Sequence, residues 1–151
     1  MTNCNGAGLL LVEDDGNDVL LIQRAFRQAN LSIPLTMVED GDEAIAYLTG
    51  QGQYADRATY PLPSLILLDL KLPRRSGLEV LEWLRGQTGL RRIPVVVLTA
   101  SREHADVDRA YEIGANSYLV KPVSFDSLTA TISALNQYWL QLNQYPSVQP
   151  A

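Results

Sequence analysis

The sequence predicts a doubly wound α/β sandwich, in which a five-stranded parallel sheet is covered by helices on both faces. Two observations support this fold class. Five short apolar runs rich in branched residues alternate with longer segments of helical periodicity, which is the pattern of βα units that feed a parallel sheet. Right-handed crossovers between such strands place helices on both faces and leave the ligand site at the carboxyl ends of the strands.

The apolar runs define the strands, and the segments between them define the helices. The predicted strands are Leu9–Val12, Leu35–Val38, Leu65–Asp69, Val95–Thr99 and Ser117–Val120. The predicted helices are Asp18–Ala29, Asp42–Leu48, Gly77–Arg85, Glu103–Ile113 and Phe125–Leu142.

Residues near the predicted helix ends support these boundaries. The first, third, fourth and fifth helices follow side chains whose oxygens can cap a helix, namely Asn17, Ser76, Ser101 and Ser124. Three helices are followed by glycines typical of helix ends, namely Gly50, Gly86 and Gly114.

The chain has the size and composition of one globular domain. Its 151 residues are enough to build a core, and 46% hydrophobic and 19% charged residues are ordinary values for such a domain. We expect the domain at residues 9–143, after a flexible N-terminus at 1–8 and before a C-terminal tail at 144–151.

Charge and hydropathy exclude several classes of partner. The net charge is −5 and no more than two basic residues stand together, so we expect no nucleic-acid partner. No apolar run approaches the roughly 18 to 20 residues of a membrane-spanning helix, and the start does not resemble a secretory signal. The lone Cys4 cannot form an internal disulfide, which agrees with a reducing compartment. These features predict a cytoplasmic protein with no membrane association.

Two segments extend beyond the minimal fold. Gln51–Pro63 is long for a connection between a helix and a strand, and it is either a partner-specific insertion or a tolerated surface loop. The last helix carries one apolar stripe at steps of four and three. Its first half is predicted to pack in the core, whereas beyond Leu135 the helix overhangs the sheet. Trp139 and Leu142 are therefore candidates for an exposed homodimer seam.

Carboxylates follow two of the predicted strands. Glu13-Asp14-Asp15 follow the first strand, and Asp69 ends the third. The carboxyl ends of parallel strands meet at one edge of the sheet, and clustered carboxylates that repel one another raise the affinity for a hard cation such as Mg²⁺. The sequence therefore predicts a magnesium site at this edge.

Two further strand ends complete this predicted site. Thr99 ends the fourth strand and is followed by the small Ala100, which supplies a hydroxyl group and open space. Lys121-Pro122 follow the fifth strand. A lysine there brings positive charge toward the carboxylates, and a phosphoryl group on Asp69 would lie between Mg²⁺ and this ammonium group.

Together these residues resemble the receiver domains of bacterial response regulators, over about Leu9–Leu140. The resemblance implies a flavodoxin-like strand order, 2-1-3-4-5, and a signalling phosphoacceptor rather than an enzyme. The matching motifs are Leu11-Val12-Glu13-Asp14, Leu67-Leu68-Asp69 with Leu72-Pro73 and Gly77, Val97-Leu98-Thr99-Ala100, Gly114-Ala115 and Tyr118-Leu119-Val120-Lys121-Pro122.

The resemblance implies a role for each residue of the site. Asp69 would be the nucleophile that accepts the phosphoryl group, and Lys121 would pair with the phosphoryl oxygens. Mg²⁺ would be held by Asp14, Asp69 and the backbone carbonyl of Lys71. Glu13 would act mainly through water.

The resemblance also implies a switch. Thr99 would move to hydrogen-bond the phosphoryl group, and Tyr118 would swing inward, which alters the face formed by the fourth helix, fifth strand and fifth helix. Lys71 and Ser101 would influence the lifetime of the phosphorylated state. The peptide bond before Pro122 is expected to be cis, a state that is accessible at low cost only before proline.

The implied donor is a phosphohistidine on a sensor histidine kinase. The long loop, Pro94–Thr99 and Tyr138-Trp139-Leu140 are further similar to the small regulators paired with cyanobacterial phytochromes, which form dimers. This narrower resemblance implies a phytochrome as the kinase and a homodimer. Because no output domain is recognisable in the sequence, we expect the signal to pass through contacts with a downstream protein.

Three other functions fit the sequence less well. An aspartyl-nucleophile phosphohydrolase usually has a second acid two residues after the nucleophile, where this chain has Lys71. A flavodoxin-like cofactor binder needs a phosphate loop after the first strand, but 13–17 is acidic. A receiver that binds partners without phosphorylation is disfavoured because no key position is missing. Asp15 is expected to be a solvated neighbour, and His104 a surface residue.

Overall fold

The computed structural model describes residues 8–148, and the predicted sheet is confirmed. Five parallel strands are hydrogen-bonded in the order β2-β1-β3-β4-β5. The strands are β1 (Leu9–Val12), β2 (Leu35–Val38), β3 (Leu65–Leu68), β4 (Val95–Thr99) and β5 (Ser117–Val120). Cys4 and residues 1–7 of the N-terminal segment that was expected to be flexible lie outside the described residues. Gly8, the last residue of that segment, is buried against Pro34.

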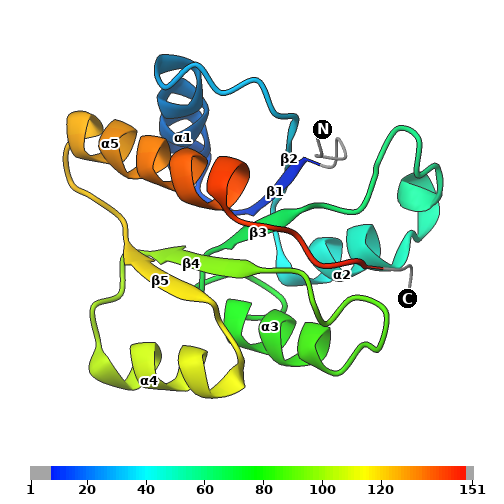
Figure 1. The fold of residues 1–151 in the computed structure, drawn as a ribbon. Coiled ribbons are helices and arrows are strands. Elements are labelled where there is room, and N and C mark those ends of the chain that lie inside the picture. The colour runs from blue at the N-terminus through cyan, green and yellow to red at the C-terminus, as the bar shows by residue number, and fades with distance from the viewer. Residues whose placement is uncertain (1–7, 149–151) are drawn as a thin grey trace.

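Helices cover both faces of the sheet (Figure 1). One face is covered by α1 and α5, and the other by α2, α3 and α4, so each face buries its own hydrophobic core. The helices are α1 (Gly16–Gln28), α2 (Gly41–Thr49), α3 (Gly77–Arg85), α4 (His104–Ile113) and α5 (Phe125–Leu135).

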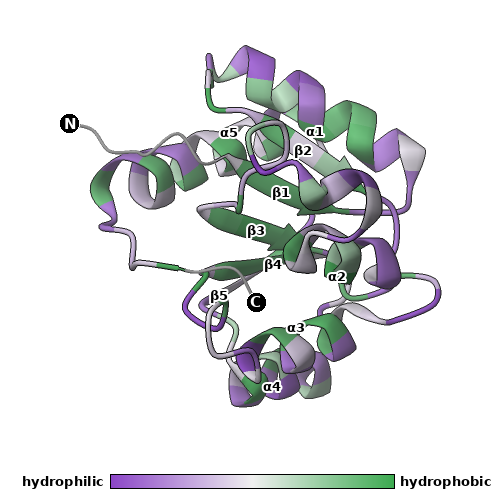
Figure 2. Cartoon of the chain, turned by 90° about the vertical axis from the view of Figure 1, so that its right-hand side faces the viewer, coloured by the Kyte–Doolittle hydropathy of each residue, from purple (hydrophilic) through white to green (hydrophobic). Residues whose placement is uncertain are grey.

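Alternation along the central strands fills both cores. Leu9 and Leu11 of β1 face the α1/α5 core, whereas Leu10 and Val12 face the α2/α3/α4 core. Every residue of β1, β3 and β4 is buried, and Figure 2 shows the central strands as strongly hydrophobic ribbons. Burial on both faces therefore explains the continuous apolar runs of the sequence.

Two predicted caps were wrong. Asp15, not Asn17, caps α1, because its carboxylate accepts hydrogen bonds from the backbone N–H groups of Asn17 and Asp18. Ser101 does not cap α4; its hydroxyl group donates to Asp106 and accepts from the backbone of Glu103. The caps predicted at Ser76 and Ser124 are confirmed.

The last helix differs from the prediction. α5 ends at Leu135, and the chain continues as a π-helix, η2 (Asn136–Leu142). Because a π-helix has more residues per turn than an α-helix, the predicted apolar stripe does not continue through it. Trp139 and Leu140 pack against the α1/α5 core, while 66% of Leu142 is exposed.

The following tail crosses from one layer to the other. The hydroxyl group of Tyr145 donates to the carbonyl of Trp139 at 2.6 Å, and Val148 packs against the α2/α3/α4 core. On the way the tail passes the residues before β3 and β4, including Pro63 and Pro94. The segment 143–148 therefore covers the amino edge of the sheet (Figure 1).

The predicted long loop is anchored rather than loose. It contains a short 3₁₀-helix, η1 (Gly52–Ala55), and Arg57 donates hydrogen bonds to the carbonyls of Tyr47, Leu48 and Tyr60. Tyr54 packs on Tyr47 and Tyr60 with ring centroids 4.9 and 5.1 Å away. These contacts fix the loop against α2, also at the amino edge.

Among residues 8–148, none of the helices has the length and apolar character that a membrane span requires.

Candidate functional site

Three carboxylates meet at the carboxyl edge of the sheet. Glu13 and Asp14 follow β1, and Asp69 follows β3. The backbone N–H of Asp69 donates to the carbonyl of Val12, the last residue of β1. One carboxylate oxygen from each of these three acids lies within 4.8 Å of the others. Glu13 and Asp69 are buried, and Asp14 is exposed. The predicted acidic cluster therefore exists, and its oxygen donors suit a hard divalent cation such as Mg²⁺.

Lys121 lies opposite these acids, as predicted. Its Nζ is 2.6 Å from Glu13 Oε1 and 3.0 Å from Asp69 Oδ2. Only 15% of the Lys121 side chain is exposed, so the charge is held close to the carboxylates. The structure thus brings the proposed acceptor and the cation together from strands that are not neighbours in sequence.

Asp18 also contacts Lys121, and sequence reasoning missed it. Its Oδ2 lies 2.7 Å from Lys121 Nζ. Asp18 belongs to the first turn of α1, directly after the cap at Asp15. An acidic residue in the first turn of the helix that follows β1 lies at the carboxyl edge, and this was the signal in the sequence that could have identified it.

Burial and ion pairing change two pKa values in the site. Burial, reinforced by the neighbouring charge of Asp69, raises the pKa of Glu13 to about 7 despite the hydrogen bond from Lys121. Burial alone would lower the pKa of Lys121, but its hydrogen bonds to Asp18, Glu13 and Asp69 outweigh this effect and raise it. The lysine is therefore held in its charged form.

The two residues predicted to switch, Thr99 and Tyr118, lie on β4 and β5. Thr99 is buried, and its Oγ1 has no hydrogen-bond partner among the described residues. Ala100 is exposed next to it, as the open edge requires. The hydroxyl group of Tyr118 donates to the carbonyl of Ser101 at 3.0 Å, and burial raises the pKa of Tyr118. Thr99 thus offers a free hydroxyl group at the site.

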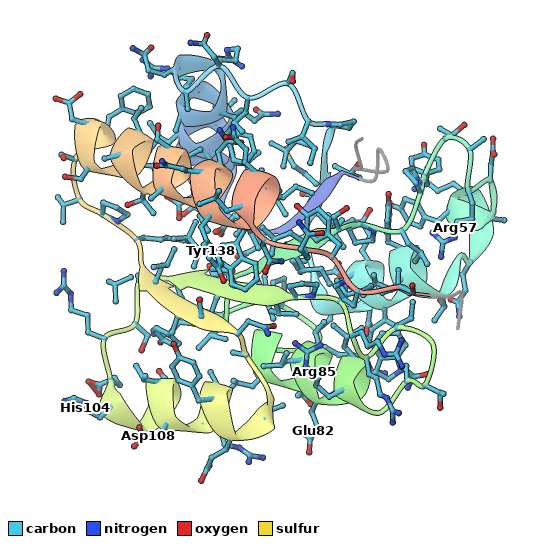
Figure 3. All side chains as sticks on the ribbon, viewed as in Figure 1. Arg57, Glu82, Arg85, His104, Asp108 and Tyr138 are labelled. Carbon is cyan, nitrogen blue, oxygen red and sulfur yellow. The ribbon has the colours of Figure 1, made fainter. Side chains whose placement is uncertain are left out.

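Two expectations around the site have different outcomes, and the structure also places the backbone of Lys71 next to Asp69. The peptide bond before Pro122 is trans, so the predicted cis bond was wrong; the trans form is favoured by about 0.5 to 1 kcal/mol before proline and still brings Lys121 to the acids. The Lys71 N–H lies 3.4 Å from Asp69 Oδ1. His104 begins α4 on the exposed surface (Figure 3), as expected.

The loop between β3 and α3 is held tightly at both ends. A Cβ atom at Gly77 would collide with the carbonyl of Asp69, and one at Gly41 would collide with the carbonyl of Arg75. The Gly77 N–H donates to Leu70 at 2.8 Å, and Ser76 and Glu79 form a capping box at the start of α3. The backbone beside Asp69 is therefore fixed by close approach of α3.

Fold and site together define a flavodoxin-like domain with a cluster of carboxylates and one lysine at the carboxyl edge of its sheet, and comparison with known proteins identifies the family. Residues 9–133 match the family model described as the response regulator receiver domain. The chain therefore belongs to the response regulator receiver family.

Several relatives and solved structures are similar over most of their length. The probable methanogenesis regulatory protein FilR2 of Methanothrix harundinacea is 41% identical, covering 91% of this chain and 86% of FilR2. Response regulator Rcp1 of Synechocystis sp. is 38% identical, covering 92% of each chain. A crystal structure of the phosphorylated cyanobacterial phytochrome response regulator RcpA has a TM-score of 0.85 at 38% identity, covering 93% of this chain and 99% of RcpA. The Mn²⁺-bound form of Rcp1 has a TM-score of 0.83 with the same identity and coverage.

Proposed function

We propose that this chain is a response regulator that accepts a phosphoryl group on Asp69 from a histidine kinase in the cytoplasm and signals through changed protein contacts. The observation that carries the proposal is the position of Asp69, a buried carboxylate 3.0 Å from the Lys121 ammonium and within reach of Glu13 and Asp14. In the reaction, the P–N bond of a phosphohistidine breaks and a P–O bond to Asp69 forms. Positioning and charge neutralisation supply most of the catalysis of such a transfer.

The acidic cluster would hold Mg²⁺ through Asp14, Asp69 and the backbone carbonyl of Lys71, with Glu13 acting through water. When bound, the ion would neutralise charge on the transferred phosphoryl group. The three converging carboxylates support this donor set, and the structure of Rcp1 with bound Mn²⁺ is that of a similar protein.

Three side chains of the site would bind the phosphoryl group and respond to it. Lys121 would donate to a phosphoryl oxygen from the side opposite the acids. The partnerless hydroxyl group of Thr99 would turn to donate to another oxygen. Movement of Thr99 would leave space for Tyr118, whose ring would exchange its hydrogen bond to Ser101 for a more buried position and so alter the α4/β5/α5 face.

We further propose a phytochrome as the kinase. At least three of the similar structures are of response regulators named for phytochromes or bacteriophytochromes. They are RcpA, RtBRR, which is 46% identical with a TM-score of 0.74, and AtBRR, which is 43% identical with a TM-score of 0.73. Transfer of radioactive phosphate from an autophosphorylated phytochrome kinase to this chain, faster than from an unrelated histidine kinase, would support this assignment; equal rates would contradict it.

We also propose a homodimer that includes η2. Beside β5 lies a hollow of about 350 Å³ whose apolar lining includes Leu119, Leu135, Tyr138 and Trp139, and Tyr138 is directed toward the sheet side of η2 in Figure 3. Leu142 adds an exposed apolar side chain on η2. Trp139 is half-buried, so it would contribute by supporting this surface as well as by contact.

Light scattering tests the dimer. Leu142→Glu and a chain ending at Gln137 should shift the mass toward the monomer, whereas Leu20→Glu, which changes a similarly exposed leucine on α1, should leave the dimer intact. A monomeric wild type, with and without phosphorylation, would contradict the proposal.

Intact mass spectrometry tests the central reaction. After incubation with acetyl phosphate and Mg²⁺, the wild type should gain the mass of one phosphoryl group, and Asp69→Asn should gain none. Asp14→Asn is expected to slow the gain because it removes one proposed metal ligand. An equal gain in Asp69→Asn would place the acceptor elsewhere, and no gain in the wild type with any phosphodonor would overturn the function.

A further inference from the structure

Lys121 contacts one more carboxylate than the proposed phosphoryl transfer needs. A lysine ammonium has three N–H donors, and here each faces a different acid: Glu13 at 2.6 Å, Asp18 at 2.7 Å and Asp69 at 3.0 Å. All of its donors are therefore engaged before any phosphoryl group arrives.

Phosphorylation of Asp69 would change which oxygen atoms the three N–H donors of Lys121 can bind. A phosphoryl group on Asp69 presents three oxygens, but Lys121 would release only the N–H that now faces Asp69. Glu13 is almost fully buried at 2% exposure, whereas the side chain of Asp18 is 33% exposed on the first turn of α1. Asp18 is thus the partner that water can replace most easily, and the one whose contact a phosphoryl oxygen can take over.

We propose that Asp18 restrains Lys121 and competes with the phosphoryl group for one of its N–H donors, so that the site holds a phosphoryl anion less tightly than Lys121 alone would allow. The inference rests on the proposed function, because it assumes that Asp69 accepts the phosphoryl group. Asp18 acts through Lys121 and is therefore a positioning residue rather than a catalytic one.

Neutralising Asp18 should change the affinities of the site for its two ligands, Mg²⁺ and a phosphoryl anion, in opposite directions. Neutralising Asp18 removes one negative charge beside Lys121, so it should weaken binding of Mg²⁺ and strengthen binding of an anion at Asp69. A unit charge several ångströms away in a partly screened environment changes each affinity by about threefold to tenfold. A purely structural loss would instead weaken both ligands, and this difference separates the two explanations.

The experiment uses the full chain and the variant Asp18→Asn, which keeps the shape of the side chain. Calorimetry measures the affinity for Mg²⁺, and fluorine NMR at saturating Mg²⁺ measures the affinity for beryllofluoride, a mimic of the phosphoryl group. We expect Mg²⁺ to bind about threefold to tenfold more weakly and beryllofluoride to bind tighter by a similar factor. Unchanged or weaker beryllofluoride binding would overturn the proposal.

Matched variants complete the test. Asp18→Glu keeps the charge and should behave like the wild type. Asp108→Asn makes the same charge change on the exposed surface of α4 (Figure 3) and should change neither affinity. Asp18→Ser provides a second neutral variant if Asp18→Asn folds poorly, and the same signs are required of it.

The failure of this inference and that of the proposed function are distinguishable. If the wild type does not bind beryllofluoride, or if Asp69→Asn binds it equally well, the proposed function fails. If the wild type binds it through Asp69 and the neutral Asp18 variants do not bind it more tightly, only the role of Asp18 is refuted.

Discussion

The two edges of the sheet differ in how their polar groups are used. At the carboxyl edge, Glu13 and Asp69 are buried beside a single ammonium group. At the amino edge, the tail and the loop at 51–63 cover the strand ends with aromatic rings, prolines and hydrogen-bonded carbonyls. Burying charge is costly unless it is paired. The paired charges of the first edge therefore suit ligand binding, whereas the neutral contacts of the second edge contribute to stability. Variants at each edge should therefore separate function from stability.

The largest effect is expected at Lys121. Lys121→Met leaves Glu13 and Asp69 buried without a cation, so we expect the free energy of unfolding at pH 8 to fall by about 3–5 kcal/mol, measured by urea denaturation without Mg²⁺. Added Mg²⁺ should restore part of this loss. Lys71→Met, at an exposed position of the neighbouring loop, should cost no more than about 0.5 kcal/mol; equal losses in the two variants would show that the ion pairs do not hold this edge together.

The pH dependence of stability should report Glu13. Its pKa is raised from 4.5 to about 7 in the folded protein, so the folded state binds a proton that the unfolded state has released. The stability that Glu13 contributes is therefore complete below about pH 4.5 and is lost as the pH rises through 7, a change of about 3 kcal/mol. In metal-free urea denaturation, the unfolding free energy of the wild type should fall by this amount relative to that of Glu13→Gln, which cannot ionise, between pH 4.5 and pH 8. A difference between the two proteins that does not change with pH would refute the raised pKa.

At the amino edge, Arg57 should affect stability alone. Arg57→Ala removes three hydrogen bonds to backbone carbonyls, and we expect a loss of about 2 kcal/mol in unfolding free energy. Phosphorylation by acetyl phosphate, measured by intact mass, should be unchanged. Arg109→Ala, on the exposed surface of α4, is the matched control. A reduced rate of phosphorylation in Arg57→Ala would mean that the two edges are coupled.

The smallest effect is expected at Tyr145. Tyr145→Phe removes the hydrogen bond to the Trp139 carbonyl and should lower the unfolding free energy by about 1 kcal/mol. Tyr111→Phe, at a half-exposed tyrosine of α4, should leave the thermal midpoint within error of the wild type. If both variants melt alike, the tail contributes little to closing this edge.

The sequence predicted the sheet well, because burial on both faces produces apolar runs that few other structures explain. Four of the strands have the predicted limits, and β3 ends one residue earlier, at Leu68. The acids, Thr99 and Lys121 also lie at the ends of the strands that the sequence predicted for them, since parallel strands bring their carboxyl ends together.

The cap of α1, the contact of Asp18 with Lys121 and the π-helix were not predicted, because hydrophobic periodicity does not determine which residue caps a helix or which backbone groups are hydrogen-bonded. Asp15 and Asn17 can both cap a helix, and only the extended backbone at Asp15 decided between them. That choice also set the rotation of α1 that aims Asp18 at Lys121. The π-helix arises from hydrogen bonds shifted by one residue, such as that from the Asn143 N–H to the Tyr138 carbonyl, and it moved Leu142 outward.

The close approach of Gly77 to the backbone of Asp69 divides the neighbouring loop into interchangeable and fixed positions. Lys71 has an exposed side chain, so a library of variants of this loop can change it with little effect on folding. Arg74 is more restricted, because its backbone has a positive φ of 69° and its Nε lies 3.3 Å from Asp40 Oδ2. Position 77 has no room for any side chain, because even a methyl group would collide with the backbone carbonyl of Asp69, the proposed acceptor. Such a library should therefore return glycine at 77 in every clone that still accepts a phosphoryl group.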